Sequence, residues 1–218
     1  MKALSLLIVL WSSFSFASEP VGYYNQGALI DGECLQESGE GYVQLLRDVG
    51  HIYGTSEMIN MLKETAADMQ RRYPGRDRLE IEDIAAKNGG DIDPHGSHEN
   101  GLDVDIQYFK ANNVEERSYA PSMVENGRAS ENFDVERNWE LMKSLHRHGS
   151  VQMIFMDTVL KNKLIDYARS KGEYNSHLRV INSFHYVPNH DDHLHVRLNC
   201  PASARRCHST TIRKGGAE

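Results

Sequence analysis

Residues 97–105 of this 218-residue chain read SHENGLDVD and place a histidine, a glycine and two aspartates beside a regular apolar alternation. Successive side chains of a strand point to opposite faces of its sheet, so the two kinds of residue separate. The apolar face holds Leu102, Val104, Ile106 and Tyr108. The opposite face holds Asp103, Asp105 and Gln107. The stretch therefore predicts a strand that carries two carboxylates on one face, just after a histidine.

A second strand with the same alternation is predicted at residues 193–198, HLHVRL. Its leucines and valine face one way, and His193, His195 and Arg197 face the other. Five of the 11 histidines fall in two short windows, PHGSH at residues 94–98 (preceded by Asp93) and HDDHLH at residues 190–195. A single histidine on a strand is most often a surface residue, but two clusters beside strand-borne aspartates indicate a metal site.

Zinc suits these ligands, and a catalytic zinc site uses three protein groups and keeps a fourth position open. His98, Asp105 and His195 would supply a His, Asp, His set. Seven extended residues span roughly 23 Å, so the chain must fold back between His98 and Asp105 for both to reach one ion. Gly101 lies where that turn is needed, because glycine tolerates a positive φ.

His193 and His195 share a strand face and would crowd each other as ligands of one ion. One of them is expected to bind the metal while the other acts as acid or base. This arrangement suits hydrolysis, in which zinc lowers the pKa of its water to about 7 and polarises the carbonyl under attack. Asp191 and Asp192 could orient the imidazoles, although we favour the simpler interpretation that they form a solvated turn.

Helices and strands follow one another in mixed order along the rest of the chain, which predicts one α+β domain with a largely antiparallel sheet and flanking helices. The hydrophobic spacing predicts helices from Thr55 or Ser56 to Tyr73, from Val135 to His148, and from Leu160 to Lys171. Further strands are predicted at 79–84, 151–156 and 178–184. Residues 111–130 are expected to form an irregular loop beside the site.

The N-terminus, MKALSLLIVLWSSFSFA, predicts a signal peptide over residues 1–17, followed by a domain over residues 18–218. Removing it leaves 23 basic and 31 acidic residues, a formal charge of −8, which argues against nucleic acid as a partner. The signal peptide predicts export, and no later segment is apolar enough to span a membrane, so the exported protein is expected to be soluble or at most peripheral.

Three cysteines remain after that cleavage, and export permits disulfides. Cys200 and Cys207 lie close together after the last predicted strand, so a local bridge is the simplest pairing. Cys34 is then left as a free thiol. A role for it as a catalytic nucleophile is disfavoured by the export context. Other hydrolytic signatures, namely HExxH, GxSxG and Ser-x-x-Lys, are missing from the sequence.

At these motifs the sequence resembles the penicillin-insensitive murein endopeptidases, zinc enzymes of the group that also contains lysostaphin, the D-Ala-D-Ala metallopeptidases and the hedgehog signalling domain. The matching stretches are SGEGY at 38–42, HGSHENGLDVDI at 95–106, MVENG at 123–127 and HDDHLHVRLNCP at 190–201. The resemblance implies the hedgehog-like fold of that group. It also implies hydrolysis of the amide between D-alanine and meso-diaminopimelate in cross-linked peptidoglycan, in the periplasm.

The resemblance also implies roles for individual residues. His98, Asp105 and His195 match the family's zinc ligands, and His190 and His193 match its acid-base and oxyanion-stabilising histidines. Cys200 and Cys207 match a family disulfide.

His95 is an additional metal candidate, since it matches a family position associated with further metal binding. The companion aspartate and histidine of that site are replaced by Asn126 and Ala129, so we expect one ion. A D,D-carboxypeptidase or dipeptidase of the same group, and a zinc-stabilised binding module without catalysis, are the alternative functions.

Overall fold

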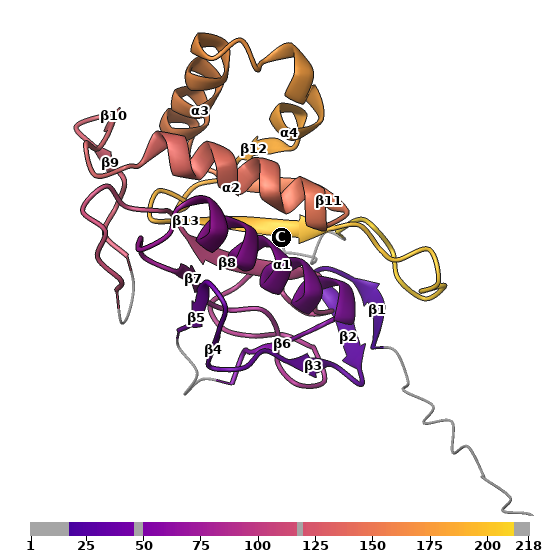
Figure 1. Cartoon of the computed structure of the whole chain (residues 1–218). Helices are drawn as coiled ribbons and strands as arrows, with labels where there is room; N and C mark the ends of the chain where they lie inside the picture. Colours follow the sequence, from indigo (N-terminus) through magenta and orange to yellow (C-terminus); the bar gives the residue numbers. More distant parts are fainter. Residues whose placement is uncertain (1–17, 46–49, 117–119, 212–218) are drawn as a thin grey trace, which may run out of the picture.

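The central element of the protein, described here by a computed structural model over residues 18–45, 50–116 and 120–211, is a mixed sheet (Figure 1). Its strand order is β12-β11-β13-β8-β7-β5-β4. The strands are β4 (Ser38–Gly39), β5 (Tyr42–Gln44), β7 (Leu79–Ile81), β8 (Asp103–Gln107), β11 (Val151–Met156), β12 (Phe184–Tyr186) and β13 (His193–Leu198). Only β11 with β12 and β5 with β7 run parallel in this sheet, so the predicted α+β fold with a largely antiparallel sheet is confirmed.

Two long helices cover one face of the sheet. They are α1 (Ser56–Arg72) and α2 (Val135–His148), which lie next to each other in Figure 1. Each begins at a side-chain cap: Thr55 Oγ1 accepts the Met58 N–H at 3.2 Å, and Asp134 accepts the N–H of Arg137 at 3.1 Å. Outside them lie α3 (Thr158–Ser170), a 3₁₀ turn (Asn175–His177) and the short α4 (Leu178–Asn182).

The apolar faces of β8 and β13 supply the core beneath these helices. Val104, Ile106, Leu194 and Val196 are fully buried and belong to one cluster with the methionines of α1. The alternation of both strands is therefore confirmed, and burial of their apolar faces against α1 and α2 fixes which face remains for polar residues. Those polar residues point away from the helices, toward the chain that precedes β8.

Short strand pairs complete the fold. They are β1 (Glu19–Tyr23) with β2 (Gln26–Ile30), β3 (Glu33–Cys34) with β6 (Tyr53–Gly54), and β9 (Val124–Glu125) with β10 (Arg128–Ala129). The last pair is a small hairpin within the stretch that was predicted to be irregular. The expected bridge between Cys200 and Cys207 is present, and Cys34 is a half-buried free thiol.

One element prediction is wrong. Residues 178–184 were expected to form a strand, but Leu178–Asn182 is the helix α4, and β12 begins only at Phe184. A run this short fits either period, and here Val180 and Ile181 are buried in the core cluster. The strand predicted at 79–84 ends at Ile81.

The predicted signal peptide, residues 1–17, lies outside the described residues. Within the described part of the chain, no helix has both the length and the apolar character needed to cross a membrane.

Candidate metal centre and active site

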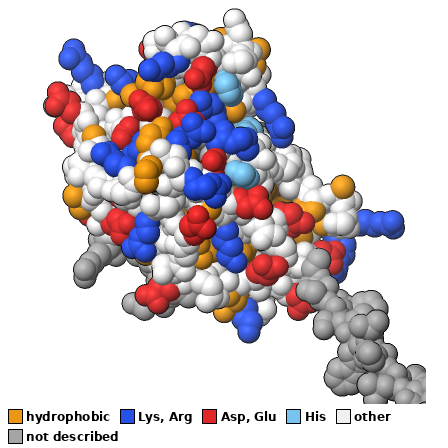
Figure 2. Space-filling model, in the orientation of Figure 1, with side chains coloured by type: hydrophobic (Ala, Val, Ile, Leu, Met, Phe, Trp, Pro, Cys, Tyr) orange, Lys and Arg blue, Asp and Glu red, His pale blue; other side chains and the backbone are white. Residues whose placement is uncertain are grey.

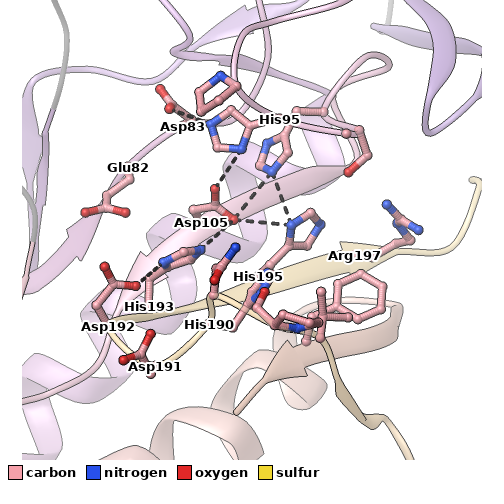
Figure 3. A pocket seen from close by; sticks show the side chains of 18 of the residues that line it. Glu82, Asp83, His95, Asp105, His190, Asp191, Asp192, His193, His195 and Arg197 are labelled. Atoms are coloured by element: carbon pink, nitrogen blue, oxygen red, sulfur yellow. Dashed lines mark hydrogen bonds and ion pairs between the residues drawn. The ribbon is translucent and has the colours of Figure 1, made fainter. Parts of the chain in front are cut away.

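The site is built where the polar faces of β8 and β13 meet. In the antiparallel register of these strands, His195 lies opposite Asp105, Arg197 opposite Asp103, and His193 opposite Gln107. Opposite residues of neighbouring strands are close enough for their side chains to touch. The two polar faces form the floor of a pocket of about 750 Å³, and Figure 3 shows His95, His193 and His195 around Asp105.

A turn brings His98 back to this floor. Gly101 adopts a φ of +75°, and a Cβ at this position would lie 2.9 Å from a methyl carbon of Leu29 and 3.1 Å from the Thr55 nitrogen. His98 itself has a φ of +71°, which is uncommon for a residue with a side chain. Its backbone N–H donates to Asp103 Oδ2 at 3.2 Å. The predicted fold-back at Gly101 is therefore confirmed.

Three potential ligand atoms converge at the floor of the pocket. His98 Nε2 lies 3.2 Å from His195 Nδ1, and Asp105 Oδ1 lies 3.4 Å and 3.3 Å from these two nitrogens. All three side chains are almost completely buried, and Asp105 Oδ1 accepts no hydrogen bond from the described residues. We refer to His98, Asp105 and His195 as the triad. It is the set predicted from the sequence.

The other nitrogen of each triad imidazole lies close to an oxygen atom. His98 Nδ1 lies 2.8 Å from the Ile84 carbonyl oxygen, and His195 Nε2 lies 3.0 Å from Asp103 Oδ1. The carbonyl oxygen only accepts, so His98 Nδ1 carries the proton. His195 Nε2 forms no hydrogen bond with the described residues, and its approach to Asp103 is an ion-pair contact. His98 Nε2 then presents its lone pair between His195 Nδ1 and Asp105 Oδ1, at the point where a cation would lie.

Asp103 and Arg197 were not assigned a role from the sequence. Arg197 donates to both oxygens of Asp103, from Nε at 2.7 Å and from Nη2 at 2.9 Å. Its guanidinium lies over the rings of Tyr24, at 4.1 Å, and Phe155, at 5.1 Å. The signal was present in the alternation, because Arg197 and Asp103 share strand faces with His195 and Asp105.

His193 and His190 lie beside the triad. His193 Nε2 is 3.9 Å from Asp105 Oδ1, and the His190 ring centre is 4.9 Å from that of His193 and 6.0 Å from that of His195. Asp192 Oδ1 holds His193 Nδ1 at 2.6 Å, so the interpretation of Asp192 as part of a solvated turn is wrong. Asp191 instead accepts a hydrogen bond from the Ser122 hydroxyl.

His95 approaches the same carboxylate from another side. Its Nδ1 lies 3.4 Å from Asp105 Oδ2, and its Nε2 lies 2.9 Å from Asp83 Oδ2. Ligand atoms of His95, His98 and Asp105 all fall within 4.8 Å of one another, which makes these residues a second candidate metal set. Asn126 and Ala129, by contrast, line a separate pocket at the β9–β10 hairpin, away from His95.

Burial and charge set the protonation of these groups. Burial lowers the pKa of His195 to about 4, despite the opposing influence of Asp103. Burial also disfavours the charged form of His193, but its bond to Asp192 and the nearby Asp105 raise its pKa to about 9. For Asp105, burial is outweighed by the surrounding imidazoles, which hold the pKa of its carboxyl far below the usual range. The triad thus offers a carboxylate and a neutral imidazole at pH 7.

Two imidazoles and a carboxylate that face a pocket leave room for a further ligand, as catalytic metal sites do and structural sites do not. The fold and the site therefore define a candidate metallopeptidase. The sequence profile of the penicillin-insensitive murein endopeptidases matches residues 20–217, and the chain belongs to this family.

Individual relatives support membership of this family. A penicillin-insensitive murein endopeptidase of Haemophilus influenzae is 30% identical over 203 residues, which cover 87% of this chain and 66% of that protein. Proteins of the same name in Klebsiella pneumoniae and Escherichia coli O157:H7 are each 24% identical, over 94% of this chain and 80% of their own length. The chain thus spans slightly less than two thirds of the Haemophilus relative.

Proposed function

We propose that this protein is a zinc-dependent murein endopeptidase that hydrolyses the D-alanyl–meso-diaminopimelyl cross-links of peptidoglycan. The observation that carries the proposal is the convergence of His98 Nε2, His195 Nδ1 and Asp105 Oδ1 at the floor of a pocket. Membership of the murein endopeptidase family supplies the substrate class.

In this proposal His98, Asp105 and His195 hold the metal. Zinc suits two imidazoles and one carboxylate, and when bound it would acidify water and polarise the scissile carbonyl. The Ile84 carbonyl orients His98 through a hydrogen bond, and Asp103 holds His195 through an ion-pair contact, so each ring would present its other nitrogen to the ion. Asp105 contributes the negative charge, and its unpartnered Oδ1 is the atom that the ion would satisfy.

His193 and His190 perform the proton transfers. Asp192 fixes His193 through Nδ1, so that Nε2 points toward the triad. From there it can donate a hydrogen bond to the oxyanion or a proton to the leaving amine. His190, held by its Nδ1 contact of 2.9 Å with the Pro188 carbonyl, lies next to it and shares this work.

The setting that we propose is the periplasm, reached by the predicted signal peptide, with cross-linked peptide stems as the partner. Figure 2 shows Lys and Arg side chains intermingled with Asp and Glu on the helical face, so this face offers no continuous basic patch for nucleic acid.

Digestion of purified muropeptide dimers, followed by mass spectrometry, tests the proposal. Dimers should yield monomers that retain their stem peptides, a chelator should stop the reaction, and zinc should restore it. His98→Ala should be inactive, whereas His148→Ala, which changes a histidine paired with Glu64 outside the pocket, should cleave like the parent. Release of free D-alanine alone would favour the carboxypeptidase alternative. Zinc binding without any cleavage would favour the binding module.

A further inference from the structure

The second oxygen of Asp105 is the inner end of a chain of polar side chains. Asp105 Oδ2 lies 3.4 Å from His95 Nδ1, and His95 Nε2 lies 2.9 Å from Asp83 Oδ2. Asp83 Oδ1 then lies 3.2 Å from His51 Nδ1. These side chains are largely buried, with 20% of His95, 12% of Asp83 and 17% of His51 exposed. This series of side chains thus connects the triad, through two residues that line the pocket, to His51, which is not part of the pocket lining.

Backbone pairing holds this chain in register with the triad. The Asp105 N–H donates to the Asp83 carbonyl oxygen at 2.9 Å, and the Glu82 N–H donates to the Asp105 carbonyl oxygen at 2.9 Å. The next residue, Ile84, accepts from His98 Nδ1 and donates its N–H to the His51 carbonyl oxygen at 2.7 Å. One extended segment after β7 therefore fixes Asp83 relative to two members of the triad.

The orientation of His95 bears on its role. Each of its ring nitrogens faces a carboxylate oxygen, Nδ1 that of Asp105 and Nε2 that of Asp83. A ring held between two carboxylates by such contacts links Asp83 to Asp105 and can hold the Asp105 carboxylate in place. His95 is therefore better placed to orient Asp105 than to replace a member of the triad.

We propose that Asp83, His95 and His51 are positioning residues that hold Asp105 Oδ2, so that Oδ1 alone is presented to the metal. This inference rests on the metal site of the proposed function. It extends that site by three residues that act through Asp105 and are not metal ligands. Residues of this kind typically change metal affinity by about 10- to 100-fold.

The test measures metal affinity directly, in addition to activity. Zinc dissociation constants would be determined by competition with a chromophoric chelator for Asp83→Asn, His95→Gln and the double variant. Visible spectra of the Co²⁺ forms would report the ligand set, and melting curves of metal-free protein would report folding. Asp166→Asn is the matched control, because Asp166 is 72% exposed on α3 and pairs only with Arg169 among the described residues.

We expect Asp83→Asn and His95→Gln each to weaken zinc binding by roughly 10- to 100-fold. The double variant should bind zinc no more weakly than the weaker-binding single variant, since both substitutions interrupt the same series of side chains. The Co²⁺ spectra should keep the parent's intensity, because no ligand is lost. Asp166→Asn should bind like the parent. If Asp83→Asn does not fold, His51→Gln at the outer end of the chain replaces it, with the same direction of change expected.

Two results would overturn the inference. One is parental zinc affinity in Asp83→Asn, and the other is loss of a ligand from the Co²⁺ spectrum of His95→Gln, which would make His95 a ligand. If the parent protein binds zinc and cleaves dimers, but the variants bind zinc as tightly as the parent, only this inference fails. A parent that neither binds zinc nor cleaves would instead remove the proposed function.

Discussion

Replacement of Asp103 with asparagine should damage both the fold and the metal site. Asp103 is fully buried and accepts two bonds from Arg197, one from the His98 backbone and the contact from His195. Burial opposes its ionisation, but chiefly Arg197 holds the pKa of its carboxyl well below the usual range. A lowered pKa means that this stabilisation is present at neutral pH and is lost as the pH falls through that value.

The size of the loss in stability follows from the charge of Arg197, which the substitution leaves unpaired. Arg197 is 6% exposed, so Asp103→Asn leaves a buried guanidinium without a counter-ion, a loss of about 3–5 kcal/mol. For a chain of this size, that corresponds to a fall in Tm of roughly 6–20 °C. His195 Nε2 also loses its ion-pair contact with Asp103, which should weaken zinc binding by about 10- to 100-fold.

A double variant separates the two effects. In Asp103→Leu/Arg197→Met both buried charges are removed together, so most of the stability should return, whereas His195 still lacks its ion-pair contact and zinc affinity should stay low. Calorimetry of metal-free protein and chelator competition measure the two quantities independently. Recovery of parental zinc affinity along with stability would refute the role of Asp103 in orienting His195.

Three further outcomes are expected. His195→Ala should lose most zinc together with activity, whereas His193→Ala should keep zinc and lose turnover by roughly 10²- to 10⁴-fold; zinc content and dimer cleavage check both. Because Asp192 contributes to the raised pKa of His193, Asp192→Asn should move the alkaline limb of the pH profile of kcat/KM to lower pH, and Asp191→Asn should not. An unchanged alkaline limb in Asp192→Asn would contradict this. Cleavage should persist at β-lactam concentrations that block serine transpeptidases, since the sequence has no Ser-x-x-Lys nucleophile, and a penicilloyl adduct seen by mass spectrometry would contradict it.

The sequence predicted the structure best where apolar and polar side chains alternate along a strand. The leucines and valines of β8 and β13 had to face the helices, so the polar faces of both strands could be predicted. The turn at Gly101 followed from the distance that His98 had to cover.

Long-range pairing could not be predicted in the same way. Asp83 reaches the site because its backbone pairs with Asp105 beyond the end of β7, and no local pattern marks that contact. Asp192 was interpreted as a turn residue, because its contact with the adjacent His193 leaves no pattern in the sequence. The five residues of α4 were too few to distinguish a helical from a strand period.

Anomalous diffraction at the zinc edge, from crystals of the zinc-loaded protein, tests the central claim most directly. The account predicts one strong peak about 2.0–2.2 Å from His98 Nε2, His195 Nδ1 and Asp105 Oδ1, with a side open to the pocket. A peak bound by His95 in place of His195, or no peak at the triad, would contradict it.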